Sequence, residues 1–325
     1  RYTAAVERYC SALAPLIRKY QITQGGPIIM VQVENEYGSY GNDRVYMKWL
    51  HDLWRDKGIE VPFYTADGAT PHMLEAGSLP GVAIGLDPAS SQAEFDEALK
   101  VHPDASVFCS ELYPGWLTHW REKWQRPSVE SIVSKVKWLM DNKKSFNYYV
   151  IHGGTNFGFW AGANSPKEGI YQPDVTSYDY DAPINEMGQA TPKYMALREL
   201  AQKYSKKKLP KIPEAPMPVI TFPATQATPF ASIWDNLPAA KHVVQPVPME
   251  MLGQYEGLIL YRTKLIGHKK GQLTIYNLND YATVFLNGKY IGSLDRTLKQ
   301  NTIEIPASDV ENPVLEILVE NMGHI

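Results

Sequence analysis

The sequence predicts an α/β region with a parallel sheet, followed by an all-β domain. Two observations carry this prediction. In the first two thirds of the 325 residues, short apolar runs alternate with helical stretches, which is typical of parallel strands buried on both faces. In the last third, apolar and polar residues alternate with a period of two, which is typical of half-buried strands. The length is sufficient for two domains.

The α/β region begins with an amphipathic stretch and continues as strands and helices in turn. The expected strands are 27–33, 61–65, 82–86, 105–109 and 148–152. The expected helices are 1–20, 43–57, 91–100, 128–143 and 192–207. Ser128 is placed to cap the fourth of these helices, because serine accepts hydrogen bonds from the free backbone N–H groups of a first turn.

Polar residues stand where the predicted strands end. They are Glu34-Asn35-Glu36, Asp67, Asp87, Ser110-Glu111 and His152. Polar groups at the carboxyl ends of many strands are typical of the active face of a (β/α)8 TIM-type barrel. Five strands are not eight, so we expect either an open sheet or a barrel whose first three strands precede Arg1, leaving strands four to eight here.

The composition changes after residue 207. Six prolines lie between residues 209 and 229, which indicates a stiff linker. Beyond it, period-two runs at 258–265, 271–276, 282–286 and 314–319 predict strands, and Asn287-Gly288 predicts a tight hairpin turn. We therefore expect three parts: 1–207 as the α/β region, 208–229 as a Pro-rich linker, and 230–325 as an incomplete β-sandwich or jelly roll.

Composition and motif spacing disfavour several functions. The net charge is −3 and the sequence shows no cluster of basic residues that would form a basic face, which argues against a nucleic-acid partner. No apolar run approaches the ~18 residues of a membrane span. Two cysteines can form neither a disulfide framework nor a sulfur metal site, and the histidines lack zinc-ligand spacing. The first residues read as a helix rather than a signal peptide.

Two glutamates at strand ends suggest chemistry on a sugar. Retaining cleavage of a glycosidic bond needs one carboxyl to protonate the leaving oxygen and one to attack carbon, held about 5 to 5.5 Å apart. Glu36 and Glu111 end strands on the same expected face, Asn35 could hold a sugar hydroxyl, and Trp116 could serve as a sugar platform. A single strand-end glutamate is more often a solvated or salt-bridged residue, so the prediction rests on the convergence of these four.

Six segments carry a resemblance to a known family. Residues 25–38, GGPIIMVQVENEYG, resemble the signature segment of the glycoside hydrolase family 35 β-galactosidases. Residues 110–116, SELYPGW, resemble the nucleophile strand of that family, and GGTNFG at 153–158 with TSYDYDAP at 176–183 resembles its later sugar-site elements. The stretches 255–263 and 319–323 are similar to its first β domain after the barrel.

The resemblance implies a hydrolase that releases terminal non-reducing β-D-galactose from oligosaccharides or glycoconjugates by double displacement, without metal or organic cofactor. It implies that Glu36 is the acid/base and Glu111 the nucleophile. It implies that Asn35 shares the acid/base position and that Tyr149, Tyr178 and Tyr180 contact the galactose ring or the nucleophile. It also implies that 1–207 is the C-terminal part of the catalytic (β/α)8 barrel and that 230–325 is of the galactose-binding type. Relative to the family, the chain is expected to be truncated at both ends, and family members are mostly exported (periplasmic or extracellular) or lysosomal.

Two alternatives remain open. One is a related exo-β-glycosidase for another terminal sugar, because the elements that read the sugar are expected partly before Arg1. The other is a catalytically silent galactoside-binding protein on the same scaffold. Two positioned carboxylates argue against the second alternative, since a binding protein has no need of them.

Overall fold

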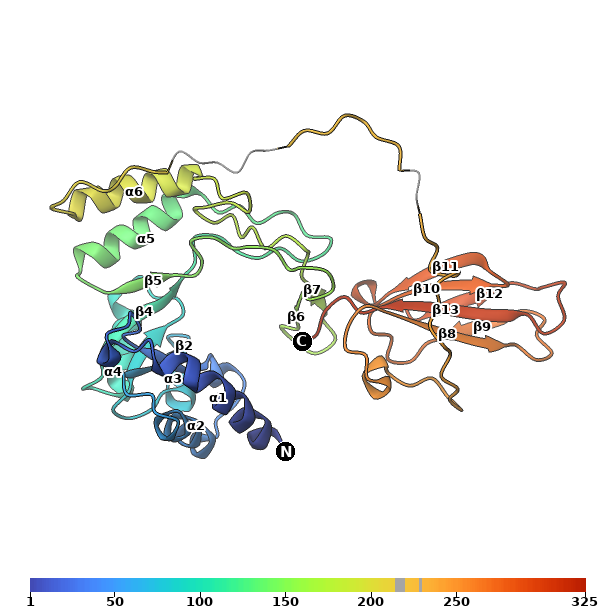
Figure 1. The fold of residues 1–325 in the computed structure, drawn as a ribbon, viewed down its shortest axis with the longest axis horizontal. Coiled ribbons are helices and arrows are strands. Elements are labelled where there is room, and N and C mark those ends of the chain that lie inside the picture. The colour runs from blue at the N-terminus through green and yellow to red at the C-terminus, as the bar shows by residue number, and fades with distance from the viewer. Residues whose placement is uncertain (214–219, 228–229) are drawn as a thin grey trace. The chain divides into compact units, whose positions relative to one another are not determined.

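The computed structural model describes residues 1–213, 220–227 and 230–325, which form two compact units (Figure 1). Unit 1 consists of Arg1–Trp116, Arg126–Gly153 and Tyr180–Glu214. Unit 2 consists of Leu117–Gln125, Gly154–Asp179 and Ala215–Ile325. Two loops of the α/β region therefore belong to the same unit as the C-terminal β domain.

Unit 1 is built on a parallel sheet of five strands in the order of the chain. The strands are β1 (Val31–Asn35), β2 (Phe63–Asp67), β3 (Ala83–Leu86), β4 (Val107–Leu112) and β5 (Phe146–Tyr148). Every neighbouring pair is parallel, which confirms the predicted parallel α/β arrangement. The carboxyl ends of all five strands consequently lie along one edge.

Six helices complete unit 1. They are α1 (Tyr2–Arg18), α2 (Arg44–Asp56), α3 (Pro71–Gly77), α4 (Gln92–Val101), α5 (Val129–Asp141) and α6 (Pro192–Tyr204), with 3-10 turns at Ile22–Gln24 and Tyr37–Ser39. The side chain of Ser128 caps α5 by accepting a hydrogen bond from Ser131 N, as predicted, and Asp43 and Thr191 cap α2 and α6. Helix α3 was not predicted, because its seven residues are too few to show a helical period.

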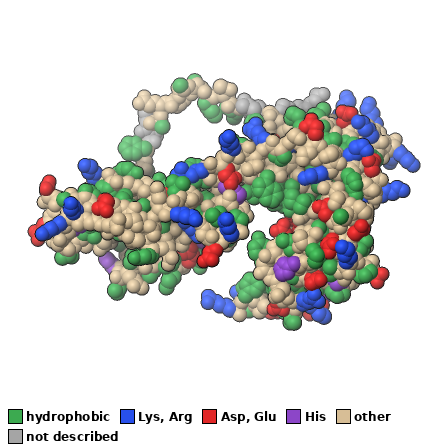
Figure 2. Space-filling model, turned by 180° about the vertical axis from the view of Figure 1, so that it is seen from behind, with side chains coloured by type: hydrophobic (Ala, Val, Ile, Leu, Met, Phe, Trp, Pro, Cys, Tyr) green, Lys and Arg blue, Asp and Glu red, His purple; other side chains and the backbone are tan. Residues whose placement is uncertain are grey.

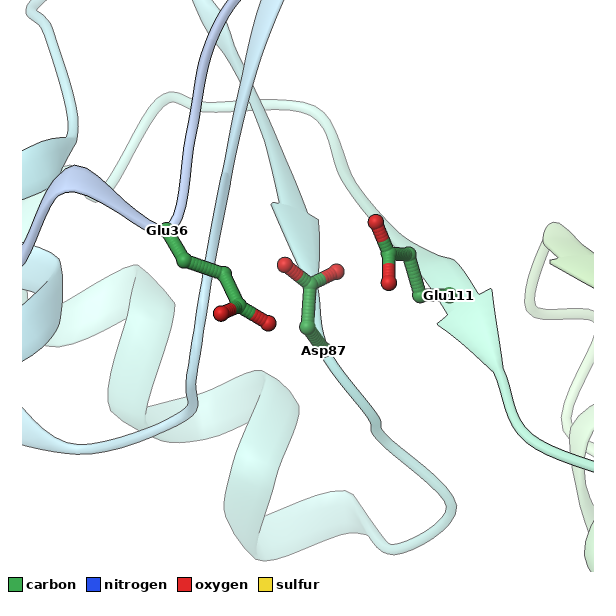
Figure 3. Close-up of side chains that lie close together, drawn as sticks. All are labelled: Glu36, Asp87 and Glu111. Carbon is green, nitrogen blue, oxygen red and sulfur yellow. The ribbon is translucent and has the colours of Figure 1, made fainter. Parts of the chain in front are cut away.

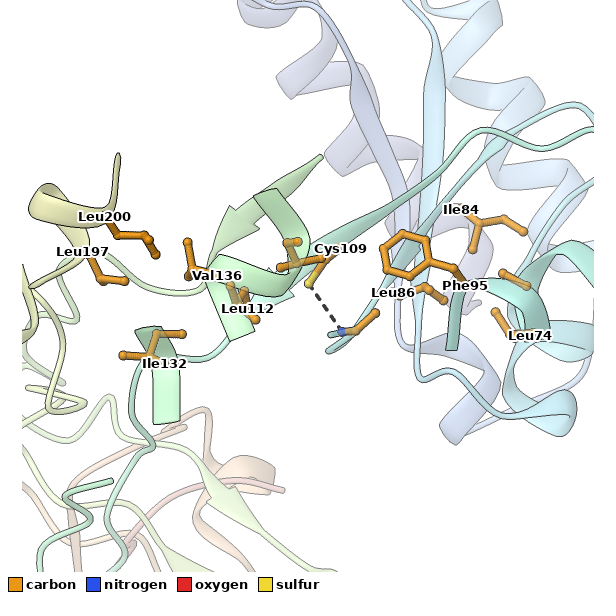
Figure 4. Close-up of a cluster of buried hydrophobic side chains, with 13 residues drawn as sticks. Leu74, Ile84, Leu86, Phe95, Cys109, Leu112, Ile132, Val136, Leu197 and Leu200 are labelled. Carbon is orange, nitrogen blue, oxygen red and sulfur yellow. Dashed lines mark hydrogen bonds between the residues drawn. The ribbon is translucent and has the colours of Figure 1, made fainter. Parts of the chain in front are cut away.

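The core of unit 1 joins the second half of the sheet to its helices. Figure 4 shows Cys109 and Leu112 of β4 between Ile132 and Val136 of α5 on one side and Leu86 of β3 on the other. Helices α5 and α6 lie side by side (Figure 1). Cys109 Sγ accepts a hydrogen bond from Ala89 N, and burial raises the pKa of this thiol to about 11, so it serves packing.

The strand bounds differ most from prediction in three strands. Strand β1 starts at Val31 instead of Pro27, because Ile28 forms an isolated parallel bridge with Gln21 and its backbone bonds to Tyr20 and Ile22 instead of to β2. Strand β4 extends to Leu112, so Glu111 lies inside the strand. The expected strand 148–152 is wrong beyond its first residue: β5 ends at Tyr148, its last partner on β4 is Leu112, and His152 instead bridges to Ile184. The apolar run 148–151 suggested a strand, but the neighbouring strand β4 ends at Leu112, so residues after Tyr148 have no strand to pair with there.

Unit 2 contains a two-sheet β domain. Strands β8 (Leu258–Lys264), β10 (Tyr281–Leu286), β11 (Lys289–Asp295) and β13 (Val314–Glu320) form an antiparallel sheet in the order β11-β10-β13-β8, and β9 (Gly271–Thr274) pairs with β12 (Thr302–Ile305). Leu273 and Ile303 of the small sheet share an apolar core with Val284 and Leu315 of the large one. This confirms an all-β second region, and Asn287 and Gly288 make the predicted turn with positive φ angles of 50° and 72°.

The loop 154–179 of unit 2 carries its own small hairpin. Strand β6 (Ala163–Asn164) pairs with β7 (Gln172–Pro173), and 3-10 turns lie at Met249–Leu252 and Arg296–Leu298.

Of the expected linker 208–229, residues 214–219 and 228–229 lie outside the described residues, and the described remainder contains neither helix nor strand. In the described part of the chain, no helix has the length and hydropathy to cross a membrane. On the face drawn in Figure 2, acidic and basic side chains are interspersed.

Candidate active site

Three carboxyl groups converge at the carboxyl edge of the unit 1 sheet. Glu36 follows β1, Asp87 follows β3, and Glu111 lies near the end of β4. Figure 3 shows their side chains pointing toward one another, with Asp87 in the middle. One oxygen of each carboxyl lies within 4.8 Å of the other two. Glu36 and Glu111, two residues that the sequence singled out, are thus brought together.

The backbone around Glu36 is pinned to the end of β2. Glu36 adopts a left-handed conformation with φ 51°, and its N–H donates to Ala66 O at 2.7 Å. Gly38 N donates to the carboxylate of Asp67 at 2.9 Å, and a Cβ on Gly38 would come within 2.1 Å of Met73 O. Burial raises the pKa of Asp67 to about 7. This turn aims the Glu36 side chain across the sheet edge.

Glu111 is half-buried and has one polar partner that sequence reasoning did not assign. Tyr113 Oη donates a hydrogen bond to Glu111 Oε2 at 3.0 Å. Burial raises the pKa of Glu111, the bond from Tyr113 lowers it, and the charge of Glu36 raises it further. The spacing of two residues along an extended strand places both side chains on one face, which is the signal that could have revealed the pair.

Asp87 is the most buried of the three carboxyls, at 8% exposure. Ser110 Oγ donates to its Oδ1, while Oδ2 has no hydrogen-bond partner among the described residues. Burial raises the pKa of Asp87 to about 7 despite the bond from Ser110, and the charges of Glu111, Glu36 and Asp67 act in the same direction as burial. The sequence showed Asp87 at a strand end but suggested no role for it.

Four aromatic rings form a continuous wall beside Glu111. The ring of Tyr113 contacts the rings of Trp116 and Tyr149 with centroid distances of 5.1 and 6.1 Å. Tyr180 lies 5.9 Å from both Trp116 and Tyr149. Tyr180 is 4% exposed, whereas Trp116 is 44% exposed and can present a face to a ligand. The structure therefore brings together Trp116, Tyr149 and Tyr180, three residues that the sequence singled out, and adds Tyr113 to them.

Lys193 holds the two segments that carry this wall. Its buried ammonium donates to Pro114 O at 2.7 Å, to Asp181 O at 3.0 Å and to the Asp181 carboxylate at 2.6 Å. A Cβ on Gly115 would lie 1.6 Å from Tyr180 O, so only glycine permits this close approach. Sequence reasoning missed Lys193, because a lysine early in a helix normally reads as a solvated residue.

Asn35 and Glu34 have separate environments. Asn35 Oδ1 accepts from Gln32 Nε2 at 2.8 Å, and Gln32 Oε1 accepts from Tyr64 Oη at 2.9 Å. The Glu34 carboxylate accepts from Asn35 N and from Tyr46 Oη, so Glu34 is the structural member of the Glu34–Glu36 pair. Tyr178 belongs to unit 2, where its N–H donates to Gly154 O, and its predicted contact with substrate stays a prediction.

The three carboxyls allow two kinds of chemistry. Hard cations such as Ca²⁺ and Mg²⁺ take carboxylate oxygens as ligands, and the distances within the trio permit one. The same groups can donate a proton and attack a carbon at one position. Flat rings with polar edges beside Glu111 suit the apolar face of a sugar, and they favour the second kind.

Comparison with known proteins gives a consistent result. Residues 1–204 match the family Glycosyl hydrolases family 35, and residues 246–325 match the domain described as Beta-galactosidase, first all-beta domain. The chain is 38% identical to "Beta-galactosidase" of Xanthomonas manihotis and 35% identical to "Beta-galactosidase 17" of Arabidopsis thaliana. All of this chain is covered in both comparisons, with 54% and 50% of the respective relatives, so the chain spans about half their length.

Among solved structures, a putative beta-galactosidase from Bacteroides fragilis is 11% identical, with a TM-score of 0.42 over 98% of this chain and 44% of that one. That likeness is too weak to bear on the fold. The family match, by contrast, covers well over half of the sequence and contains all three carboxyl groups of the site. The chain belongs to glycoside hydrolase family 35.

Proposed function

We propose that the full-length protein is a retaining exo-β-galactosidase that releases terminal non-reducing β-D-galactose from oligosaccharides or glycoconjugates. One observation carries the proposal: the carboxyl oxygens of Glu36 and Glu111 approach within 4.8 Å. This close approach of one oxygen from each carboxyl supports the pair of a retaining enzyme, whose carboxyl groups lie about 5 to 5.5 Å apart.

In the first step, Glu111 attacks the anomeric carbon while Glu36 gives its proton to the glycosidic oxygen. The bond from carbon to the leaving oxygen breaks, and an ester between carbon and Glu111 forms. In the second step, Glu36 takes a proton from water as that water attacks the same carbon. Galactose leaves with retained configuration, Glu36 regains its proton, and Glu111 regains its charge.

The surrounding side chains have separate roles in this proposal. Tyr113 occupies Oε2 of Glu111, which leaves Oε1 for the attack. The amide of Asn35 holds the sugar hydroxyl next to the reacting carbon, where hydrogen bonding strengthens toward the transition state. The exposed face of Trp116 supports the sugar ring, and Tyr149, Tyr178 and Tyr180 complete the contacts to it.

We further infer that strands β1 to β5 correspond to strands four to eight of a (β/α)8 barrel in the longer polypeptide. The parallel order of the five strands supports this inference, as does the convergence of carboxyls at their carboxyl ends. For the domain limits we propose 1–207, a linker at 208–229, and 230–325, supported by family matches at 1–204 and 246–325. Export or lysosomal targeting stays a prediction.

The direct test is turnover of a chromogenic β-galactoside by the full-length protein, with proton NMR to identify the first anomer released. The proposal predicts β-galactose before mutarotation, and no loss of rate when chelator is added. Faster turnover of another β-glycoside in a matched panel would favour the related exo-β-glycosidase. Galactoside binding without turnover would favour the silent binding protein.

A further inference from the structure

Of the two loops that belong to unit 2, one begins and the other ends next to a residue of the aromatic wall. Residues 117–125 directly follow Trp116, and residues 154–179 directly precede Tyr180. Trp116 and Tyr180 are ring neighbours in unit 1. Because the backbone is continuous, the position of these loops constrains the residues that carry both rings.

The two loops are joined to each other by hydrogen bonds. Trp120 N donates to Pro173 O at 2.8 Å, and Gln172 Nε2 donates to the Glu122 carboxylate at 3.0 Å. His119, which is buried, contacts Asn164 through Nε2 at 2.8 Å and Glu122 through Nδ1 at 2.9 Å. A displacement of one loop would therefore be transmitted to the other.

An arginine–carboxylate pair joins the shorter loop to the β domain. Arg121 donates from Nε and Nη2 to one oxygen of Asp295, at 3.2 and 2.7 Å, although 174 residues separate the two. Asp295 ends β11 and its side chain is only 2% exposed. Its other oxygen accepts from the backbone and hydroxyl of Thr297. Burial acts to raise the pKa of Asp295, but the bonds from Thr297 and Arg121 outweigh burial and lower it.

Tyr171 joins the longer loop to the same domain. Its hydroxyl donates to Gly323 O at 2.8 Å, and the guanidinium of Arg296 lies 4.0 Å from its ring centroid. Arg296 in turn pairs with Asp280 at 2.8 Å, whose side chain is as buried as that of Asp295. Earlier in the same loop, Ala163 N donates to His324 O at 2.9 Å.

These contacts favour one docked arrangement over others. A buried carboxylate that loses its cation is destabilised, which disfavours undocking of Arg121 from Asp295. At Gly323 a Cβ would come within 2.5 Å of Gly162 O, so the backbones of loop and domain are in direct contact there. Because both loops are fixed in this way, the backbone at the adjoining residues Trp116 and Tyr180 is restrained as well.

We propose that Arg121 is a positioning residue: by binding Asp295 it fixes both loops on the β domain and so holds Trp116 and Tyr180 in place for the sugar. The proposal rests on the proposed function.

The test replaces Arg121 by Met in the full-length protein, which removes the charge and keeps the aliphatic stem. The matched control is Arg262→Met, because Arg262 pairs with the buried Glu316 within the β domain, and both arginines are about half exposed. Hydrogen exchange is followed by mass spectrometry in peptides covering 117–125, 154–179 and the flanking residues 113–116 and 180–182. KM and kcat are measured on a β-galactoside.

For Arg121→Met we expect faster exchange in both loops and both flanks, and a kcat/KM lower by between about tenfold and about a hundredfold, since misplacement by about 1 Å has effects of this size. Arg262→Met should leave both readouts as in the wild type. Arg121→Lys keeps the charge, and should restore part of the protection and part of the rate. This variant also serves if Arg121→Met does not fold.

Unchanged exchange in Arg121→Met would overturn the proposal, and so would equal losses of rate in Arg121→Met and Arg262→Met. If the wild-type protein hydrolyses no β-galactoside, the proposed function fails, but the exchange of the loops and of the flanks at Trp116 and Tyr180 still decides whether Arg121 positions them.

Discussion

Glu36 and Glu111 are held by different means, and the difference matches their proposed roles. The backbone of Glu36 is fixed by hydrogen bonds. Among the described residues, the carboxyl groups of Asp87 and Glu111 lie next to its side-chain carboxyl. Burial and the charge of Glu36 hold the pKa of Glu111 above its usual value, and the hydrogen bond from Tyr113 opposes them by favouring the charged form that a nucleophile needs. A group that gives and takes a proton must change its charge, whereas a nucleophile must be ionised at the start.

Replacement of Glu36 by Ala should separate substrates by leaving group. General acid catalysis contributes about 10² to 10⁴ in rate, so kcat/KM on an unactivated galactoside should fall by that factor. A dinitrophenyl galactoside needs no protonation and should retain most of its rate of bond cleavage. Glu34→Gln is the matched control, because Glu34 bonds to Asn35 N and Tyr46 and should affect both substrates alike. Equal losses on both substrates in Glu36→Ala would argue against the acid/base role.

Asp87 should make the protein less stable as the pH rises. Its pKa is about 7 in the folded protein and near 3.9 in an unfolded chain, so between these values the folded state keeps a proton that the unfolded state releases. The stabilisation is complete below about pH 4 and is lost as the pH rises through 7. Asp87→Asn removes this loss, which amounts to at most roughly 4 kcal/mol for three pH units.

Thermal unfolding of the full-length protein between pH 4 and pH 8 measures this effect. Asp87→Asn should melt higher than the wild type at pH 8, with the difference shrinking toward pH 4. Asp104→Asn, at an exposed position, provides the control and should follow the wild-type curve. A parallel course of Asp87→Asn and wild type at every pH would show that Asp87 is not a buried carboxyl of this kind.

At the residue scale, candidate site residues could be selected from the sequence where they lie within one contiguous motif. Glu36 with Asn35 and Glu111 with Trp116 could be selected because each pair stands next to a strand end. Lys193 and the unpartnered oxygen of Asp87 could not, because their importance depends on which backbone or side-chain atoms lie nearby in space.

At the scale of elements, the sheet of unit 1 places the carboxyls and its core keeps them in register. Leu86 is completely buried and directly precedes Asp87 on β3. Leu86→Ala should lower the free energy of unfolding by about 2 to 5 kcal/mol, because the cavity adds to the lost transfer energy. Leu16→Ala, at an exposed position of α1, should change it by less than about 0.5 kcal/mol. Urea unfolding followed by tryptophan fluorescence measures both, and similar values for the two variants would contradict this description of the core.

The order and type of most elements could be predicted, because parallel buried strands and capped helices leave strong local patterns. The bounds of β1 and β5 could not, since they depend on the partner strand. Strands β11 and β12 were missed because polar residues interrupt their alternation, while the Asn287-Gly288 turn before β11 already signalled a hairpin.

At the scale of the whole molecule, the division into units does not follow the order of the chain. No local pattern could predict that residues 117–125 and 154–179 join the β domain, because the contacts that join them, such as Arg121 with Asp295, link positions far apart in the sequence. The alternation of composition predicted two regions, whereas contacts between residues far apart in the sequence determine the unit to which each loop belongs.

Residues 1–325 expressed alone should be inactive and should melt without cooperativity. Within the described residues, β1 and β5 each pair on one side only, which leaves two apolar edges of the sheet open to association. Circular dichroism, a melting scan and a β-galactoside assay of this fragment beside the full-length protein measure the difference. A cooperative melt with full turnover would contradict the assignment of β1 to β5 as strands four to eight of a barrel.

The central claim is that Glu111 attacks the sugar while Glu36 transfers the proton. A 2-fluoro galactoside with a good leaving group tests it most directly, because the fluorine slows hydrolysis of the covalent intermediate. After reaction with the full-length protein, peptide mapping by mass spectrometry should find one fluorogalactosyl group, on Glu111. A label on Asp87, Glu36 or any other residue, or rapid turnover without a covalent species, would contradict the account.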